Sequence, residues 1–194
     1  MALASRLRSR LAQDDFKKLG IVLFTPLLVV PLAGLYGVLH NQISFSVSPE
    51  YFTRFKFQQF GLEGVRLPDR VRASIVGFLA AWWMGVPVGF LVGASAAVHP
   101  SPRRMLKAVL ESALIVVGVA LLFGALGLAF GFLRTSHIRA VDYNDWYIPN
   151  HVHHLRRFLC AAYMHNASYL GAALAVLAAW GYQLMRRRRE APRS

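Results

Sequence analysis

Histidine has the greatest capacity for chemistry in this chain, because imidazole binds transition metals and exchanges protons near neutral pH. His151 and His154 are three residues apart, so on a predicted helix they share a face about 4.5 Å apart along its axis. That spacing predicts a chelating pair for a divalent transition metal such as zinc, copper or iron. Further ligands would come from His40, His137 and Asp142, with Glu50 and Asp145 as candidate general bases. The spacing does not match the His-Glu-x-x-His pattern of metalloproteases.

His165 poses a separate question, because it lies eleven residues after His154 and about 16 Å further along the same predicted helix. The two side chains cannot bind one ion. With Asn166 beside it, His165 is predicted to lie within an apolar layer, where a polar side chain usually faces the bundle interior and has a partner. The expected partners are His40, Tyr36 and Tyr169. A buried, hydrogen-bonded histidine is the first interpretation, and a haem held between His165 and His40 is the alternative.

The elements that must position these side chains are four apolar runs in a chain that is 56% hydrophobic and 16% charged. Each run is long enough to cross a bilayer core, and they cover residues 20–39, 73–98, 108–133 and 159–185. The first run is too long for the core of a cleaved signal peptide. We therefore predict an all-α membrane protein with one integral domain, residues 1–194. Its four transmembrane helices form a bundle, with a small structured cap made by the outer loops 40–72 and 134–158.

The distribution of basic residues predicts the orientation of the chain. The two terminal tails and the short loop between the second and third runs hold 13 Lys and Arg residues, whereas the two long loops hold 9. Basic residues near span ends favour the cytoplasmic side, so both termini are predicted in the cytoplasm and the long loops in the periplasm. Six of the seven histidines then share the outer side, and His99 is the exception. Basic clusters beside spans are typical of contacts with lipid head groups, so nucleic acid is not an expected partner.

Small residues recur every fourth position in the second run, which places them on one helical face: Gly77, Ala81, Gly85, Gly89, Gly93 and Ala97. Gly171 belongs to a similar series in the fourth run. Such faces let helix backbones approach closely in lipid, where no hydrophobic force drives association. They predict a compact bundle, with a small face left over for a membrane protein partner or a second copy of the chain.

The two outer loops are predicted to be structured. Residues 43–48 alternate apolar and serine side chains, which predicts a strand. Ser48-Pro49-Glu50 predicts the start of a helix, and Gly61 its end. In the second loop, Asn150 is expected to cap a helix that begins at His151 and continues into the fourth run.

The stretch from His40 to Phe57, HNQISFSVSPEYFTRFKF, resembles a segment of uncharacterised bacterial four-span inner-membrane proteins. The resemblance implies a bacterial inner-membrane location and transfers no catalytic residues. The leading hypothesis is a non-catalytic, multi-pass inner-membrane protein acting in binding or as an accessory subunit of a membrane complex. The second is a metal-dependent membrane enzyme with a periplasm-facing histidine and carboxylate site. The third is a haem-binding electron carrier.

Overall fold

The computed structural model describes residues 2–138 and 143–190, and of residues 2–10 the backbone only. Every regular element in these ranges is a helix. The long helices are α1 (Ala2–Val47), α4 (Asp69–Ala81), α5 (Gly85–Ala96), α6 (Pro102–Arg134) and α7 (Leu155–Glu190). The short elements are α2 (Pro49–Tyr51), a π-helical turn (Phe52–Lys56), α3 (Phe57–Gln59) and a 3-10 turn (Trp82–Met84) that joins α4 to α5.

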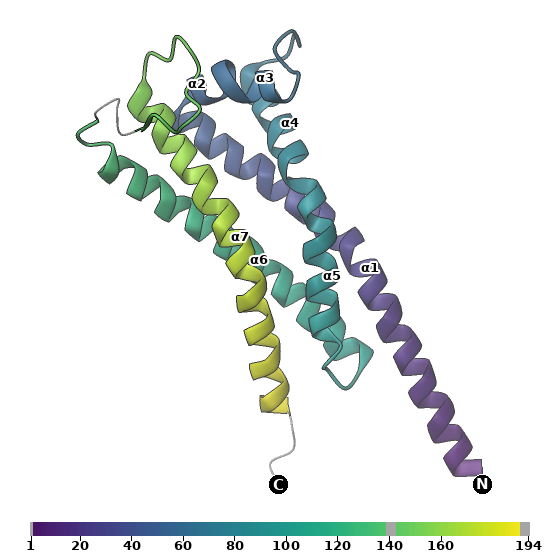
Figure 1. Cartoon of the computed structure of the whole chain (residues 1–194). Helices are drawn as coiled ribbons and strands as arrows, with labels where there is room; N and C mark the ends of the chain where they lie inside the picture. The colour runs from purple at the N-terminus through teal and green to yellow at the C-terminus, as the bar shows by residue number, and fades with distance from the viewer. Residues whose placement is uncertain (1, 139–142, 191–194) are drawn as a thin grey trace.

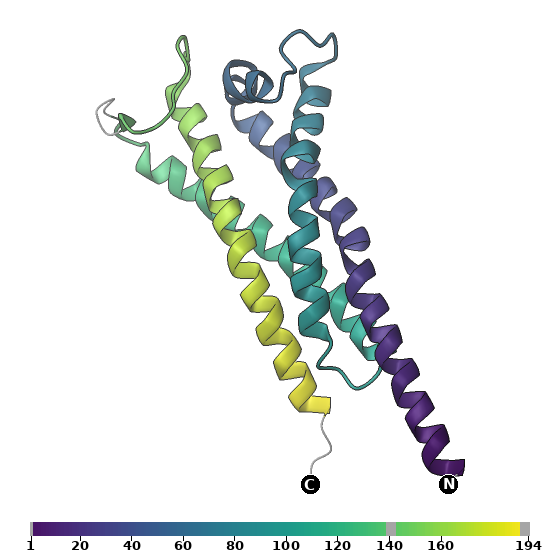
Figure 2. The same ribbon diagram turned by 45° about the vertical axis from the view of Figure 1, so that its right-hand side comes forward.

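Four helical stretches are long and apolar enough to cross a membrane: Leu11–Val47, Asp69–Ala96, Pro102–Arg134 and Leu155–Glu190. The prediction of a bundle of four long apolar helices is confirmed. Figures 1 and 2 show the first turn of α1 and the last turn of α7 at one end of the bundle, which we name the terminal end. The short helices α2 and α3 lie at the opposite end, which we name the aromatic end.

The strand predicted for residues 43–48 is wrong, because α1 continues as a helix to Val47. The buried residues in and just before this stretch are His40, Asn41, Ser44, Phe45 and Ser48, which follow the three- and four-residue spacing of a helical face. The alternation of serine with apolar residues therefore does not mark a strand face, because burial follows the spacing of a helix. Its serines bond back to the helix, with Ser46 Oγ donating to the carbonyl of Gln42 at 2.9 Å.

The helices pack as two neighbouring pairs, with α1 along α4 and α5, and α6 along α7. The first pair meets backbone to backbone, since a Cβ atom built on Gly77 would lie 2.2 Å from the carbonyl oxygen of Gly37. The small face of α4 and α5 continues along α1, with Gly85 against Val30, Gly89 against Pro26 and Gly93 against Thr25. In the second pair, Gly171 of α7 packs against the Phe123 side chain of α6. At these glycines the helices of each pair approach closely and gain van der Waals contact.

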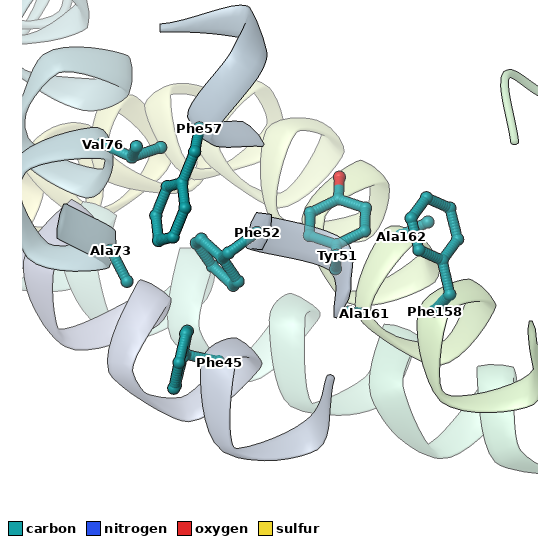
Figure 3. Close-up of a cluster of buried hydrophobic side chains, with 9 residues drawn as sticks. All are labelled: Phe45, Tyr51, Phe52, Phe57, Ala73, Val76, Phe158, Ala161 and Ala162. Atoms are coloured by element: carbon teal, nitrogen blue, oxygen red, sulfur yellow. The ribbon is translucent and has the colours of Figure 1, made fainter. Parts of the chain in front are cut away.

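The aromatic end is filled by a hydrophobic cluster contributed by four separate parts of the chain (Figure 3). Its buried members are Phe45, Tyr51, Phe52, Phe57, Ala73, Val76, Phe158, Ala161 and Ala162. The predicted helix start is confirmed, since Ser48 Oγ accepts a hydrogen bond from the Tyr51 backbone N–H at 3.2 Å. The π-helical turn that follows hydrogen-bonds residues five apart, so Phe52 and Phe57 both reach the cluster.

The terminal end is held by polar side chains that tie α7 to α5 and α6. Glu111 of α6 accepts hydrogen bonds from Arg186 and, at 2.7 Å, from Tyr182. Glu190 lies 3.3 Å from Nδ1 of the buried His99 and 3.6 Å from Arg104. The carboxylates of α7 and α6 therefore already have cationic partners at this end.

Candidate binding site

The predicted metal ligands do not come together in the structure. His151 and His154 do not share a helical face, because α7 begins at Leu155 and His151 has a left-handed backbone with a φ of 62°. His137 and Asp145 are exposed, and Asp142 lies outside the described residues. Among residues 2–138 and 143–190, no group of three His, Cys, Asp or Glu side chains is arranged to hold a metal ion. The predicted helix start at His151 is wrong, so the helical spacing on which the chelating pair was predicted is absent.

Glu50 holds the backbone immediately before α7. Its carboxylate accepts hydrogen bonds from the backbone N–H groups of His153, at 3.1 Å, and His154, at 2.7 Å. These groups precede the first turn of α7, where N–H groups have no partner inside the helix. Partial burial alone would raise the pKa of Glu50, but the hydrogen bonds from His154 and His153 and the nearby His154 ring outweigh it, so the pKa lies below its usual value. Glu50 therefore links α2 to α7 and is not a free general base.

His165 does face the bundle interior, and it meets His40 as the sequence indicates. The two imidazoles form an edge-to-face contact with ring centroids 4.6 Å apart, and both side chains are buried. Nε2 of His165 lies 3.1 Å from Ser44 Oγ. Nε2 of His40 lies 2.8 Å from Ser168 Oγ, which is also within hydrogen-bond distance of the Met164 carbonyl. Ser168 has one hydroxyl hydrogen and two acceptors within reach, the Met164 carbonyl and His40 Nε2, so the direction of its hydrogen bond with His40 depends on the tautomer of His40.

This arrangement does not fit the haem alternative. The two rings touch directly, so no porphyrin plane can lie between them. Each Nε2, the nitrogen that would bind iron, is directed instead at a serine hydroxyl. Asn166 is exposed and takes no part in the buried polar group.

Beside the histidine pair lies a cavity of ≈140 Å³ between the two helix pairs, which we name the histidine cavity. Its polar residues gather toward one end: Tyr36, His40, Asn41, His165, Ser168 and Tyr169. The rest of its wall is apolar and made largely of small residues, among them Ala33, Gly77, Ala80, Gly85, Ala113 and Ala172. The Tyr36 hydroxyl is buried and makes no hydrogen bond of normal geometry among the described residues, although the Ser168 hydroxyl lies near it. A buried hydroxyl without a partner is costly, so this atom is available to a bound molecule.

The short helices at the aromatic end cover the histidine pair. The Tyr51 ring lies on that of His165, with centroids 4.9 Å apart and an interplanar angle of 31°. Lys56 lies above this layer, with Nζ 4.5 Å from the Phe55 ring centroid and 2.8 Å from Gln59 Oε1. Burial lowers the pKa of Lys56 to about 8. Lys56 thus places an amine near the histidine pair but outside the wall of the histidine cavity.

The sequence identifies His40, Tyr36, Tyr169 and His165 as a possible group, but Ser44, Ser168 and Lys56 were missed. The serines lie four residues after His40 and three after His165, the spacing that places them beside each histidine on its own helix. That spacing could have identified both serines from the sequence. Nothing in the sequence indicates that the two faces oppose each other.

Comparisons of the chain with family models, with curated proteins and with solved structures find no match in any of the three. The fold defines the class as a helical bundle with four helices that can cross a membrane. A function must therefore be argued from the site alone.

Proposed function

We propose that this protein is a non-catalytic, multi-pass protein of the bacterial inner membrane that binds a single-chain amphipathic molecule in the histidine cavity. The observation that carries the proposal is the polarity of the cavity, with hydrogen-bonding groups toward one end and apolar walls elsewhere. The unpartnered Tyr36 hydroxyl supports it, because a ligand oxygen would satisfy that group. We further propose that the aromatic end faces the periplasm and both termini the cytoplasm, on the distribution of basic residues.

The chemistry of the wall narrows the ligand class. The lining residues include no charged side chain, which favours a neutral head with hydroxyl or carbonyl oxygens over a phosphate. The α1 wall runs from Val29 to Asn41, roughly 18 Å along the helix axis. Small residues on α4, α5 and α6 keep the space narrow. Its ≈140 Å³ is close to the volume of a cavity that holds one benzene molecule, so it would take the head and first carbons of one acyl or isoprenoid chain, with the rest of the chain outside.

The contact between Ser168 and His40 invites comparison with the nucleophile and base of a hydrolase. In such a pair the histidine accepts the serine hydrogen. Here the Ser168 hydroxyl also lies 2.9 Å from the Met164 carbonyl, which competes with His40 for its one hydrogen. We propose a binding role for the pair and assign no catalytic role to it. A role as an accessory subunit, with a membrane protein or a second copy as partner, is compatible with ligand binding and stays a prediction.

A photocrosslinking experiment tests the proposal. The probe is a photoactivatable long-chain alcohol with an alkyne tag, added to the purified protein in mild detergent. Labelled peptides should map to residues 29–41 and 165–172. Ala172→Leu places an isobutyl branch in the cavity and should reduce this labelling by about fivefold, whereas Ala173→Leu, on the exposed face of the same helix, should leave it unchanged. Equal labelling of both variants would contradict the proposal, as would stoichiometric tightly bound metal in the purified protein.

A further inference from the structure

A second hollow lies at the terminal end, far from the histidine pair. It is a groove of ≈500 Å³ between α1 and the start of α6. Its floor is apolar and includes Phe24, Leu28, Leu106 and Val109, while Lys17 and Arg103 are its only charged residues. Both cations are exposed and lie where the apolar part of their helices begins.

We propose that this groove binds an anionic phospholipid, with an acyl chain along the floor and the phosphate between Lys17 and Arg103. The apolar floor of the groove suits the acyl chain of such a lipid, and the two basic side chains at its border suit the phosphate. The proposal is independent of the ligand in the histidine cavity.

The pairing of neighbouring charges distinguishes these two cations from the other basic residues at this end. Arg104 lies 3.6 Å from Glu190, and Lys107 lies 3.9 Å from Glu111. Within the described part of the chain, neither Lys17 nor Arg103 has an acidic side chain within ion-pair distance. Neither cation is held in an ion pair, although Asp14 and Asp15 lie within one turn of Lys17, and an anionic head group would contact both cations.

Gly20 keeps the groove open. A Cβ atom built on Gly20 would meet no atom within 4 Å, although the residue lines the groove. A side chain added there would occupy the groove without displacing a neighbouring helix. Gly118 of α6 is a matched control, because its Cβ position is equally free but lies outside the groove.

The test is native mass spectrometry of the full chain in mild detergent, titrated with phosphatidylglycerol or phosphatidylcholine of the same acyl chains. The wild type should prefer the anionic lipid by about tenfold to thirtyfold, as two surface cations would give. Lys17→Gln with Arg103→Gln should reduce that preference to within about twofold, whereas Arg104→Gln should retain it. Gly20→Leu should weaken binding of the anionic lipid, and Gly118→Leu should not.

Three results would overturn the proposal. One is an unchanged lipid preference in the double variant. Another is equal binding by the Gly20→Leu and Gly118→Leu proteins. The third is displacement of the lipid by millimolar inorganic phosphate, which would identify a simple anion site without use of the apolar floor.

Discussion

Replacing Gly77 by alanine tests whether the contact between α1 and α4 supports the bundle. The new Cβ atom would lie 2.2 Å from the Gly37 carbonyl oxygen and 2.5 Å from its carbonyl carbon. Both are backbone atoms, so no side chain can rotate away. Cβ atoms are essentially never closer than 3.0 Å to such neighbours, so the helices must separate by at least about 0.8 Å, the difference between 3.0 and 2.2 Å.

The free energy follows from the contacts that this separation weakens. A gap of 0.5–1 Å forfeits a quarter to a half of the ~0.1–0.2 kcal/mol of each atom pair. Across a crossing with a few dozen close pairs, the loss is about 2 kcal/mol. Alanine recovers up to about 1 kcal/mol through its higher helix propensity. Gly118→Ala receives that gain without the clash, so the two variants should differ by about 2 kcal/mol.

Thermal unfolding in one detergent measures this difference. Gly77→Ala should unfold below the wild type, with Gly118→Ala at or above it, and the midpoints should be separated by roughly 4–8 °C for a chain of this size. Cys160 provides a second readout, because its buried thiol should react with a maleimide only when the bundle opens. Coincident midpoints for the two variants would refute the inference that a backbone contact at Gly77 stabilises the fold.

Two further predictions concern charged residues at the aromatic end. Glu50→Ala removes the acceptor for the N–H groups of His153 and His154, and should cost about 1–2 kcal/mol and increase amide hydrogen exchange at both. Because the pKa of Glu50 is lowered on folding, its stabilisation is present above the usual value of 4.5 and should be lost as the pH falls through the folded-state value, a dependence absent from Glu50→Ala. Lys56→Met removes a buried amine whose pKa falls to about 8, so the wild type should gain stability relative to the variant as the pH rises from about 8 to 10.5. Melting curves across this pH range measure the stability difference between the wild type and Lys56→Met. A difference that stays constant with pH would contradict the burial of the Lys56 amine.

Most of the fold could be predicted from the sequence, because long apolar helices depend on local composition. The four runs match the four long helices, and Ser48 begins a helix as its side chain predicts. The errors arose where a distant residue decides the local structure. No helix begins at His151, where the backbone is left-handed, and the N–H groups of His153 and His154 instead bond to Glu50, about a hundred residues earlier. Residues 43–48 were mistaken for a strand because their buried face becomes visible only against α7 and the short helices.

The candidate site was predicted less completely, for the same reason. The depth of His165 follows from its position within an apolar run, and the structure bears out its inward orientation. Its contact with Ser44, and that of His40 with Ser168, depend on how α1 and α7 face each other. Helical spacing identifies residues on one face, but it does not identify the opposing helix.

The histidine cavity is divided between two helix pairs that are synthesised one after the other. Tyr36, His40 and Gly77 belong to the pair made first, whereas Ser168 and Ala172 belong to the pair made last. With the four helices in a bilayer, as we propose, the first wall is inserted before α7 has been synthesised. It is then open sideways to the surrounding lipid, and molecules dissolved in the membrane have access to it. Under the proposed function, the order of translation gives the ligand an entry route during biogenesis, before the second pair completes the site.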